Sequence, residues 1–493
     1  MQLSALRLRL LVVSLLTVSF IGALDNTVVS TSLATIAGDL GALQNMGWVI
    51  VGYTLASTVT LPVIGKLADL LGPRSVFLVS LVVFIAASLA CGFSSSMLWL
   101  VAARVVQGMS SAGLQLMSQT IIARVATPRQ RPKLLSIVGA AFPIAILIGP
   151  VLGGLITDYW GWPWVFWINL PVGAVAFALA IFAVPHIEPG VRAPFDFAGT
   201  ISLTVALVAV VLAVTWVGDP SQGLQTVLAF GCCAVATAVF FVIELRVAEP
   251  IVPLRFFADR TVAAGTVLSA IVGISVFSLT SYLPTYFQMA YQLSATLSGL
   301  VPIATVFGML VSNVATGILA SRTGEYRLFP IIGTSLGTAG LLAMAALPVG
   351  LPIWVPMVAM AIVGVGTGSF MSLIVAVVQS AVPSSETGSI TAAVNLARQV
   401  GATVATALIG GVIGFGVAAL LPGGLDAQTL TPQLVRAASP AVQLQVAEVY
   451  STVFVPIFAA TALVFAVGIV ASVLLPPGRL SDERVADVET LSV

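Results

Sequence analysis

The chain has 493 residues, of which 59% are hydrophobic and only 8% are charged, with a formal net charge of +1. Soluble domains carry about 25% charged residues, so this composition excludes a water-soluble fold, and the charge balance gives no reason to expect nucleic acid as a partner. We expect no disulfide framework, metal or cofactor, because no C-x-x-C spacing occurs and the cysteines and histidine are few: Cys91, Cys232, Cys233 and His186.

Long apolar runs follow one another along almost the whole chain. A helix needs about 20 apolar residues to cross a hydrocarbon core of about 30 Å. These runs predict an all-α integral membrane protein with fourteen spans. Their approximate limits are 9–33, 47–67, 75–94, 98–122, 134–157, 165–184, 197–217, 225–245, 261–287, 298–320, 328–347, 354–378, 388–416 and 450–475.

The basic residues test this number, because short cytoplasmic loops carry an excess of Lys and Arg. With a cytoplasmic N-terminus, every basic residue except Arg104, Arg398 and Arg436 falls on the inner side. We therefore expect both termini in the cytoplasm. The first apolar run passes residue 25 without an Ala-x-Ala site, which favours a span over a cleaved leader. The excess of Arg over Lys suits a GC-rich bacterium, so we expect a multi-pass protein of a bacterial plasma (inner) membrane.

A weak internal repeat divides the chain. The segment 65–72 (G-K-L-A-D-L-L-G) returns as 317–324 (G-I-L-A-S-R-T-G), each time after the second span of a six-span unit. Secondary transporters build two halves around a central site from such repeats. The predicted domains are an N-terminal six-helix bundle (1–187), an inserted two-helix hairpin (188–254), and a C-terminal six-helix bundle (255–493) with a cytoplasmic tail. Its outer loop, 417–449, is expected to hold a short helical hairpin.

Ionisable groups inside spans are functional candidates, because burying them in lipid costs several kcal/mol. Asp25 is the only carboxylate well inside a predicted span. A carboxyl that alternates between an apolar environment and a nearby cation binds and releases a proton. We expect this role for Asp25; the alternative is a permanently ionised Asp25 in a structural pair with Arg104. Glu244, near the inner end of its span, is expected to pair with Arg246.

Polar residues form a stripe on the fourth span, where Arg104, Gln107, Ser111, Gln115 and Ser118 recur at intervals of three and four residues. Such a stripe lines a water-filled cavity or packs against another helix, and the arginine favours the cavity. Further predicted cavity residues are Asn26, Tyr282, Tyr286, Asn313, Asn395 and Arg398, with Phe277, Phe307, Met309 and Met371 in an apolar wall.

The fifth span contains Gly149, Pro150, Gly153 and Gly154. Pro150 removes a backbone donor and is expected to kink the helix, while Gly149 and Gly153 let a neighbouring helix approach closely. This predicts a bent helix at an interface that moves, or a static packing contact.

The inner loop after the second span holds Gly65, Asp69, Gly72 and Arg74. Gly72 permits a left-handed turn. Asp69 can cap a helix end or pair with a basic residue, and its chemistry alone favours the cap.

Taken together, these motifs resemble the fourteen-span drug:proton antiporter family of the major facilitator superfamily. The resemblance rests on residues 24–29 (L-D-N-T-V-V), 65–72, 104–108 and 149–154, in that order. It implies two six-helix bundles with two inserted helices, Asp25 as a protonation site and Arg104 as its assistant. It also implies that residues 149–154 shape an antiport cavity, and that Asp69 and Arg74 form an inner gate latch. The chain departs from the family pattern at Ala34, Leu70, Pro73, Ala145 and Ser321.

The expected function is transport and not enzymatic catalysis. We expect a monomeric, proton-coupled antiporter that exports amphipathic neutral or monocationic compounds by alternating access, as multidrug efflux that confers antibiotic resistance. The substrate class follows from the absence of acids in predicted spans 9 to 13. The expected partners are a small amphipathic substrate, protons and the lipid bilayer. One alternative is a dedicated exporter of an endogenous lipid or secondary metabolite. A membrane enzyme or sensor is remote, because 417–449 holds no nucleophile–base pair.

Overall fold

The computed structural model describes residues 4–40, 46–186, 195–216, 222–247, 250–252, 254–348, 350–421 and 430–482. This part of the chain is helical and contains no named strand. The helices are α1 (Ala5–Asp39), α2 (Gly47–Leu71), α3 (Pro73–Gly92), α4 (Met97–Val125), α5 (Arg131–Gly139), α6 (Ala141–Trp160), α7 (Pro163–Trp167), α8 (Asn169–Ala183), α9 (Phe197–Trp216), α10 (Gly223–Glu244), η3 (Leu254–Ala258), α11 (Arg260–Gly273), η4 (Ile274–Leu279), α12 (Thr280–Ala290), α13 (Ala295–Ser298), α14 (Leu300–Thr323), α15 (Leu328–Ala346), α16 (Trp354–Ser380), η5 (Ser384–Glu386), α17 (Thr387–Leu420), α18 (Pro432–Ala437) and α19 (Pro440–Leu474).

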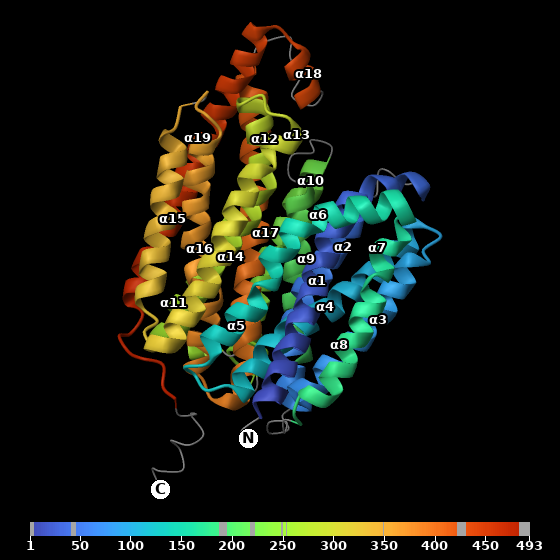
Figure 1. Cartoon of the computed structure of the whole chain (residues 1–493), viewed down its shortest axis with the longest axis vertical. Helices are drawn as coiled ribbons and strands as arrows, with labels where there is room; N and C mark the ends of the chain where they lie inside the picture. The colour runs from blue at the N-terminus through green and yellow to red at the C-terminus, as the bar shows by residue number, and fades with distance from the viewer. Residues whose placement is uncertain are drawn as a thin grey trace.

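Within the described residues, 14 segments are long and apolar enough to cross a membrane, which confirms the predicted number. Three of these spans join consecutive α-helices, and a fourth joins η5 with α17. The three pairs are α5 with α6, α7 with α8, and α11 with α12. The last pair is connected by η4, a wider π-type turn. Helix α1 begins and α19 ends at the same end of the bundle, as an even number of spans requires (Figure 1). We call this the inner end.

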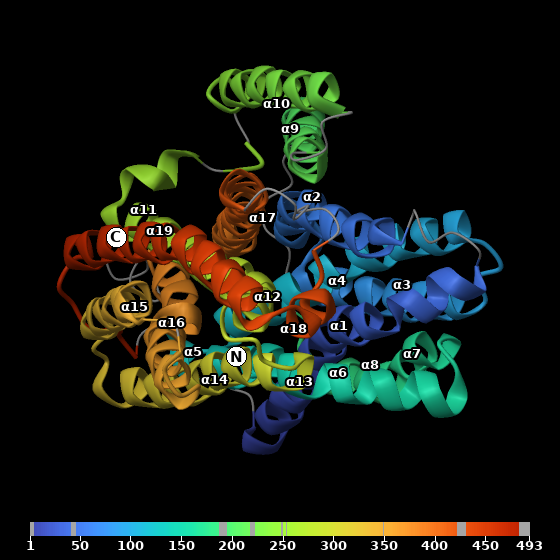
Figure 2. The same cartoon turned by 90° about the horizontal axis from the view of Figure 1, so that it is seen from above.

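The helices form two groups with a separate pair beside them. Figure 2 shows most of α1 to α8 on one side, α11 to α19 on the other, and α9 with α10 set apart, while α5 reaches across to α14 and α16. We call the two groups the N-half and the C-half. Helix α9 packs against α2 of the N-half and α17 of the C-half, and α10 packs against α9. The inserted pair is therefore attached at the junction of the two halves. The predicted boundary at 187/188 lies outside the described residues.

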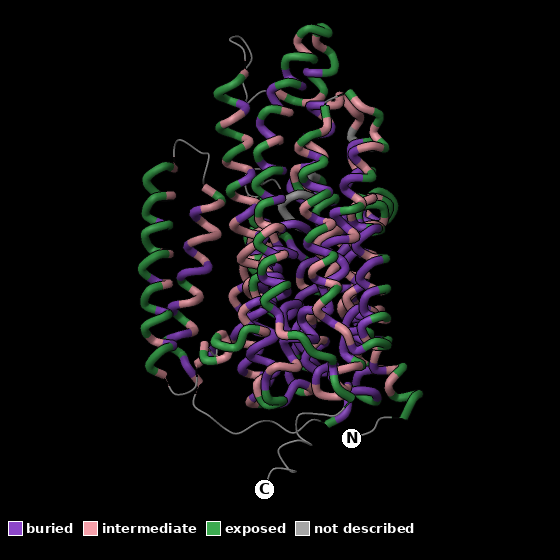
Figure 3. The backbone as a smooth tube through the Cα atoms, turned by 90° about the vertical axis from the view of Figure 1, so that its left-hand side faces the viewer, coloured by how far each residue is buried: buried purple, intermediate pink, exposed green. Residues whose placement is uncertain are grey.

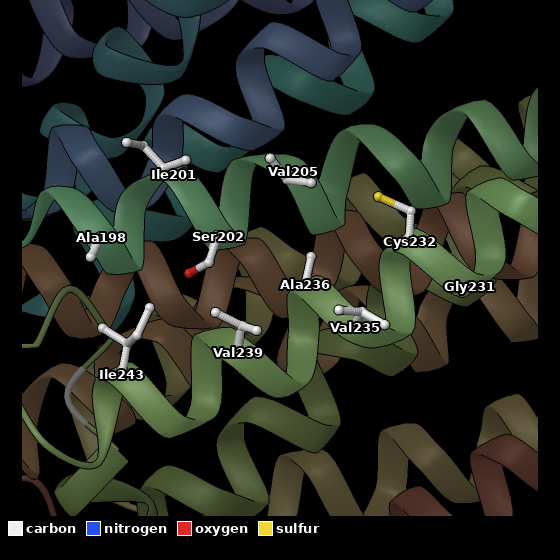
Figure 4. A pocket seen from close by; sticks show the side chains of 10 residues that line it. All are labelled: Ala198, Ile201, Ser202, Val205, Gly231, Cys232, Val235, Ala236, Val239 and Ile243. Atoms are coloured by element: carbon white, nitrogen blue, oxygen red, sulfur yellow. The ribbon is translucent and has the colours of Figure 1, made fainter.

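An apolar groove of about 610 Å³ runs between α9 and α10 (Figure 4). Its lining contains a single hydroxyl and no charged side chain, so it offers no chemistry for the predicted proton site. The lining residues are Ala198, Ile201, Ser202, Val205, Gly231, Cys232, Val235, Ala236, Val239 and Ile243.

The fifth span is interrupted at a place that was not predicted. The helix runs through Pro150 without interruption, and the break between α5 and α6 lies at Ala140. Pro143 explains this position, because it lacks the N–H that would bond to the carbonyl of Gly139 one turn earlier. The predicted kink at Pro150 is therefore not a break in the helix.

The predicted outer loop is shorter than expected. Helix α17 continues to Leu420 and α19 already begins at Pro440, so both helices take residues from the 417–449 segment. Pro440 occupies the first turn of α19, where the missing N–H of a proline does no harm. Between them lies the short helix α18, and residues 422–429 are outside the described part. The expected helical hairpin is thus a short helix followed by an extension of α19 (Figure 1).

Candidate functional site

The centre of the N-half holds a buried ion pair between Asp25 on α1 and Arg104 on α4. Asp25 is 1% exposed and Arg104 is 0% exposed. Oδ2 of Asp25 accepts a hydrogen bond from Nη1 of Arg104. Oδ1 accepts from Gln107 Nε2 and from Asn169 Nδ2, each at 2.8 Å. Three donors converge on this carboxylate, and a charged acceptor makes stronger hydrogen bonds with them than a neutral one.

Aromatic and backbone groups hold the guanidinium of Arg104 in place. Its Cζ lies 4.1 Å from the centre of the Tyr53 ring, a cation–π distance. Its Nε donates to the carbonyl of Val49 at 3.3 Å, and Nη1 donates to Gln107 Oε1 at 2.8 Å. Nη2 is buried without a partner in the described structure. This free N–H is a group that a rearranged site could use.

Most of the polar stripe on α4 packs against other helices. Gln107 and Ser118 are fully buried, and Ser111 accepts a hydrogen bond from the hydroxyl of Tyr53 at 2.6 Å. Gln115 is partly exposed. The predicted cavity lining by Gln107 and Ser111 is therefore absent in this conformation, and the alternative of helix packing accounts for their contacts.

Asn26, beside Asp25 on α1, is partly exposed. Its Oδ1 is buried and has no hydrogen-bond partner in the described structure. Of the predicted cavity residues on α1 and α4, Asn26 and Gln115 are thus the two that reach a surface.

Helix α6 lies close against α1 through the two predicted glycines. A Cβ atom on Gly149 would overlap Oγ1 of Thr27, and one on Gly153 would overlap Oγ1 of Thr31. Thr27 Oγ1 also donates to the carbonyl of Ala145 on α6 at 3.2 Å. Gly154 faces away, with nothing within 4 Å of its Cβ position. The contact couples α6 to the helix that carries Asp25.

Asp69, at the inner end of α2, caps a helix of the opposite half. Its carboxylate accepts from the backbone N–H groups of Gly388 at 3.1 Å and Ser389 at 2.9 Å, in the first turn of α17. The hydroxyl of Ser389 donates to it at 2.8 Å, and Arg124 of α4 at 3.3 Å. Gly65, one turn earlier, allows this approach, since its Cβ would lie 2.6 Å from that of Ala392. The acid thus joins the inner ends of α2 and α17 across the two halves.

The predicted partner of Asp69 is wrong. Arg74 donates to the carbonyl of Ile181 at 3.0 Å, within its own half, and Arg124 is the cation beside Asp69. Arg74 follows Gly72, which has a φ of 83° and turns the chain from α2 into α3. That turn aims Arg74 towards α8 and away from the gate.

The second copy of the loop motif forms another gate contact by other means. Gly317 of α14 packs against Ser136 of α5, and Asn313 donates to the carbonyl of Ser136 at 3.0 Å. Ser321 has no carboxylate, and its backbone carbonyl accepts from Arg129 Nε at 3.1 Å. Arg131 donates to the carbonyl of Gln379 at 3.0 Å.

A polar layer joins the halves deeper in the bundle. Asn395 of α17 donates to Gln119 Oε1 on α4 at 2.8 Å, and Arg398 donates to Asn395 Oδ1. Thr58 of α2 donates to Gln399 Oε1. Asn395 and Arg398 are buried, at 1% and 8% exposure. No described ion pair includes Arg398.

The hydrogen bonds between the halves lie in the inner part of the bundle. Among the described residues, the bond between Thr58 and Gln399 is the outermost of them. Buried residues also concentrate towards the inner end, and exposed ones towards the opposite end (Figure 3). Beyond the polar layer, side chains of α17 such as Phe415 are exposed. The two halves are therefore joined by hydrogen bonds at the inner end in this structure.

The predicted aromatic residues of the C-half have different environments. Tyr286 is 2% exposed and packs in an aromatic cluster with Phe454 and Phe458 of α19, so it lines no cavity in this conformation. Its position near the C-terminal end of α12 turns it towards α19. Tyr282 is partly buried and donates to the carbonyl of Thr406 at 3.1 Å.

The predicted apolar wall is not assembled as a group. Met309 and Met371 are buried, Phe307 is exposed, and the side chain of Phe277 lies outside the described part. The described residues include no group of three or more His, Cys, Asp or Glu that could hold a metal ion.

Comparisons with known proteins agree with this architecture. The family model of the Major Facilitator Superfamily matches residues 15–406. The multidrug transporter protein MdtP of Bacillus subtilis is 30% identical over 97% of this chain and 95% of its own length. An uncharacterized MFS-type transporter of Mycobacterium tuberculosis is 33% identical over 83% of this chain, which spans only 60% of that protein. The proton:xylose symporter XylE superposes with a TM-score of 0.66 at 13% identity, covering 99% of this chain and 100% of its own, which shows the shared fold.

Proposed function

Since the chain belongs to the Major Facilitator Superfamily, we propose that it is a proton-driven antiporter that exports amphipathic neutral or monocationic compounds. Membership makes it a multi-pass membrane transporter and not an enzyme, and its relatives include proteins named for multidrug transport. The observation that carries the coupling is the Asp25–Arg104 pair, the one ion pair of the described structure in which both side chains are fully buried.

A closed inner gate corresponds to the outward-facing state of the transport cycle. In this stage Asp25 is ionised and its proton site is empty, because all of its partners donate hydrogen bonds to it. A proton that arrives from outside neutralises the carboxylate and ends its ion pair with Arg104. Breaking a buried pair by losing one charge costs about 3–5 kcal/mol, enough to shift an equilibrium between two packings of the helices.

Two contacts connect this event to the rest of the molecule. Helix α1 packs against α6 at Gly149 and Gly153, so a movement of α1 displaces α6. Arg104 contacts α2 through Val49 and Tyr53, and α2 carries Asp69 at the gate. Protonation of Asp25 thereby favours release of α17 and opening of the inner end. The proton then leaves to the cytoplasm when Arg104 returns to Asp25.

The charges of the C-half support the substrate class. Its described membrane helices offer one buried cation, Arg398, and no buried acid, because Glu386 is partly exposed and Glu448 is exposed. A dication would find no counter-charge there, whereas neutral or singly charged amphiphiles bind by apolar contact. The dedicated export of one endogenous lipid or secondary metabolite is the second candidate, and it differs only in the breadth of compounds carried.

The test of coupling uses the purified chain in proteoliposomes with an imposed pH gradient. The probes are tetraphenylphosphonium, a lipophilic monocation, and a neutral amphipathic dye. We expect Asp25→Asn to abolish accumulation against the gradient, because Asn binds no proton. Asp39→Asn is the matched control on the same helix; Asp39 accepts from Trp162 Nε1 at 2.9 Å near the outer end, and this variant should keep accumulation. Accumulation by Asp25→Asn at the level of the unmodified chain would refute proton coupling at this residue.

The breadth of transport separates the two candidates. We expect an efflux-deficient host that expresses the chain to resist several unrelated amphipathic compounds. Resistance to none of them, with the chain present in the membrane, would favour export of a single endogenous compound.

A further inference from the structure

The predicted pair of Glu244 with Arg246 at the inner end of α10 is wrong. No described ion pair joins these two residues, and Oε1 of Glu244 accepts from the N–H of Val252 at 3.4 Å instead. Two of the described ion pairs at the inner end involve the segment that follows α19. We call this segment, residues 475–482, the strap; it leaves the inner end of α19 (Figure 1).

The strap is attached to the C-half along the turn between α14 and α15. The hydroxyl of Tyr326 donates to the carbonyl of Pro476 at 2.7 Å, and the N–H of Leu480 donates to the carbonyl of Gly324 at 2.9 Å. Leu480 is 7% exposed and packs into the hydrophobic core. Gly324 ends α14 with a φ of 75°, a left-handed conformation that glycine adopts at low cost. These contacts give the strap a fixed course.

The far end of the strap reaches the N-half at Arg129, in the turn between α4 and α5. The backbone N–H of Arg129 donates to the carbonyl of Ser481 at 3.1 Å. Its Nη1 donates to Asp482 at 2.8 Å. Both side chains of this ion pair are partly open to solvent, so the pair itself contributes little. The backbone hydrogen bond does not depend on charge and joins the two halves directly.

The guanidinium of Arg129 also binds the end of α14. Nε donates to the carbonyl of Ser321 at 3.1 Å and Nη2 to the carbonyl of Arg322 at 2.7 Å, both in the last turn of that helix. The last carbonyls of a helix lack partners within it and carry the negative end of its dipole, so they favour a cation. Arg129 therefore lies between the end of α14 and the strap. Two of its four described bonds to the C-half are made with the strap.

We propose that the strap ties the N-half to the C-half at the contact of α14 with α5, and keeps this side joined while the contact of α2 with α17 opens. The turn that carries Arg129 is held from two sides, by the end of α14 and by a segment continuous with α19. It cannot leave α14 without also breaking its bonds to the strap. This role goes beyond the proposed transport and is independent of the coupling at Asp25.

Hydrogen exchange of the purified full chain tests this tie, because a hydrogen-bonded amide exchanges only when its bond opens. Leu480→Ser removes the apolar side chain that holds the strap on the C-half. We expect this variant to expose about one further amide to fast exchange in a peptide that covers residues 126–131, because the N–H of Arg129 donates to the strap. That peptide belongs to the other half and carries no substitution, so a change there reports the tie.

Arg479→Gln is the matched control within the strap, since Arg479 forms an exposed ion pair with Glu325 of the same half. It should leave the exchange of residues 126–131 unchanged. The proposal would be overturned by unchanged exchange of this peptide in Leu480→Ser, or by an equal change in Arg479→Gln. An increase that extends equally to residues 387–391 of α17 would also overturn it, because the strap would then stabilise the whole inner end and not this side.

Distances between spin labels test whether this side stays joined. Labels at Gln130→Cys and Leu328→Cys, both exposed positions, lie on the two halves, in a chain without the two cysteines of α10. We expect Asp69→Asn alone to leave a single distance between these labels, and its combination with Arg129→Gln to add a longer one. A longer distance in Asp69→Asn alone, or none in the double variant, would contradict the proposal. Both measurements are structural, so their outcome leaves the coupling role of Asp25 unaffected.

Discussion

Asp69→Asn should open the inner gate while leaving the two halves folded. Asp69 is the only carboxylate that joins the halves along the described part of the α2–α17 seam, and four donors reach it. Asparagine keeps the shape of the side chain but removes its charge from the α17 N-terminus and from Arg124. Its amide N–H₂ also faces the N–H of Ser389, where the carboxylate had accepted.

The size of the effect follows from these contacts. Hydrogen bonds to a charged group contribute about 1.5–3 kcal/mol each, and loss of a helix N-cap costs about 0.5–2 kcal/mol. The amide retains part of this bonding, so we take a net loss of about 2 kcal/mol. Since 1.4 kcal/mol corresponds to a tenfold change in an equilibrium constant, the ratio of closed to open gates should fall roughly 30-fold.

Distances between spin labels measure that ratio. Labels at Leu71→Cys and Ser384→Cys report on the α2–α17 seam, in a chain whose exposed Cys232 and partly exposed Cys233 are replaced by serine. We expect Asp69→Asn to add a population with a longer distance between the two labels.

Arg74→Gln is the matched control for this measurement, since Arg74 contacts only the N-half in the described structure. An unchanged distance distribution in Asp69→Asn would refute the reasoning. So would an equal change in Arg74→Gln, because the effect would then not arise from the gate contact.

Two further substitutions test the packing. Gly149→Ala should lower the free energy of unfolding by about 1–3 kcal/mol, because its Cβ overlaps Thr27, whereas Gly154→Ala should have little effect. Thermal unfolding in detergent compares the two variants. Equal melting temperatures would contradict the close contact of α1 with α6. Tyr286→Ala should lower the free energy of unfolding by about 3–5 kcal/mol, because it leaves a cavity beside Phe454. At a temperature where the variant stays folded, its selectivity among transported compounds should be unchanged. Altered selectivity without loss of stability would instead place Tyr286 in a cavity wall.

The membrane topology could be predicted from the sequence because the physical requirement is simple. Runs of about 20 apolar residues and the placement of basic residues are local signals, and they predicted the spans and the shared end of the termini. The short motifs predicted the family. All three predictions are confirmed. The loop motif also singled out Gly65 and Asp69, which contact α17 of the other half; their role as a gate stays a prediction.

Contacts between distant helices were harder to predict. Asn169 completes the Asp25 site from α8, and its isolated position in an apolar run was a signal that could have been used. Arg124 could not be distinguished from the other cytoplasmic arginines, because only the packing of α4 against α2 and α17 brings it to Asp69. The polar residues predicted on α4 do lie on one face of the helix. Helical periodicity, however, cannot say whether that face contacts water or another helix.

The two seams at the inner end, α2–α17 and α14–α5, are held together by different chemical groups. They therefore differ in their sensitivity to pH. The α2–α17 seam depends on one buried titratable carboxylate, whereas the α14–α5 seam is held by arginines on backbone carbonyls, by an asparagine and by an exposed ion pair of Arg129 with Asp482. An exposed ion pair contributes little, so acidification of the cytoplasm weakens the first seam more than the second. Opening need not separate both sides at once, and the α14–α5 side can remain joined as a pivot about which the halves swing. We propose that a single acid at Asp69, with Ser321 at the matching place, gives a nearly symmetric pair of halves one latch and one hinge.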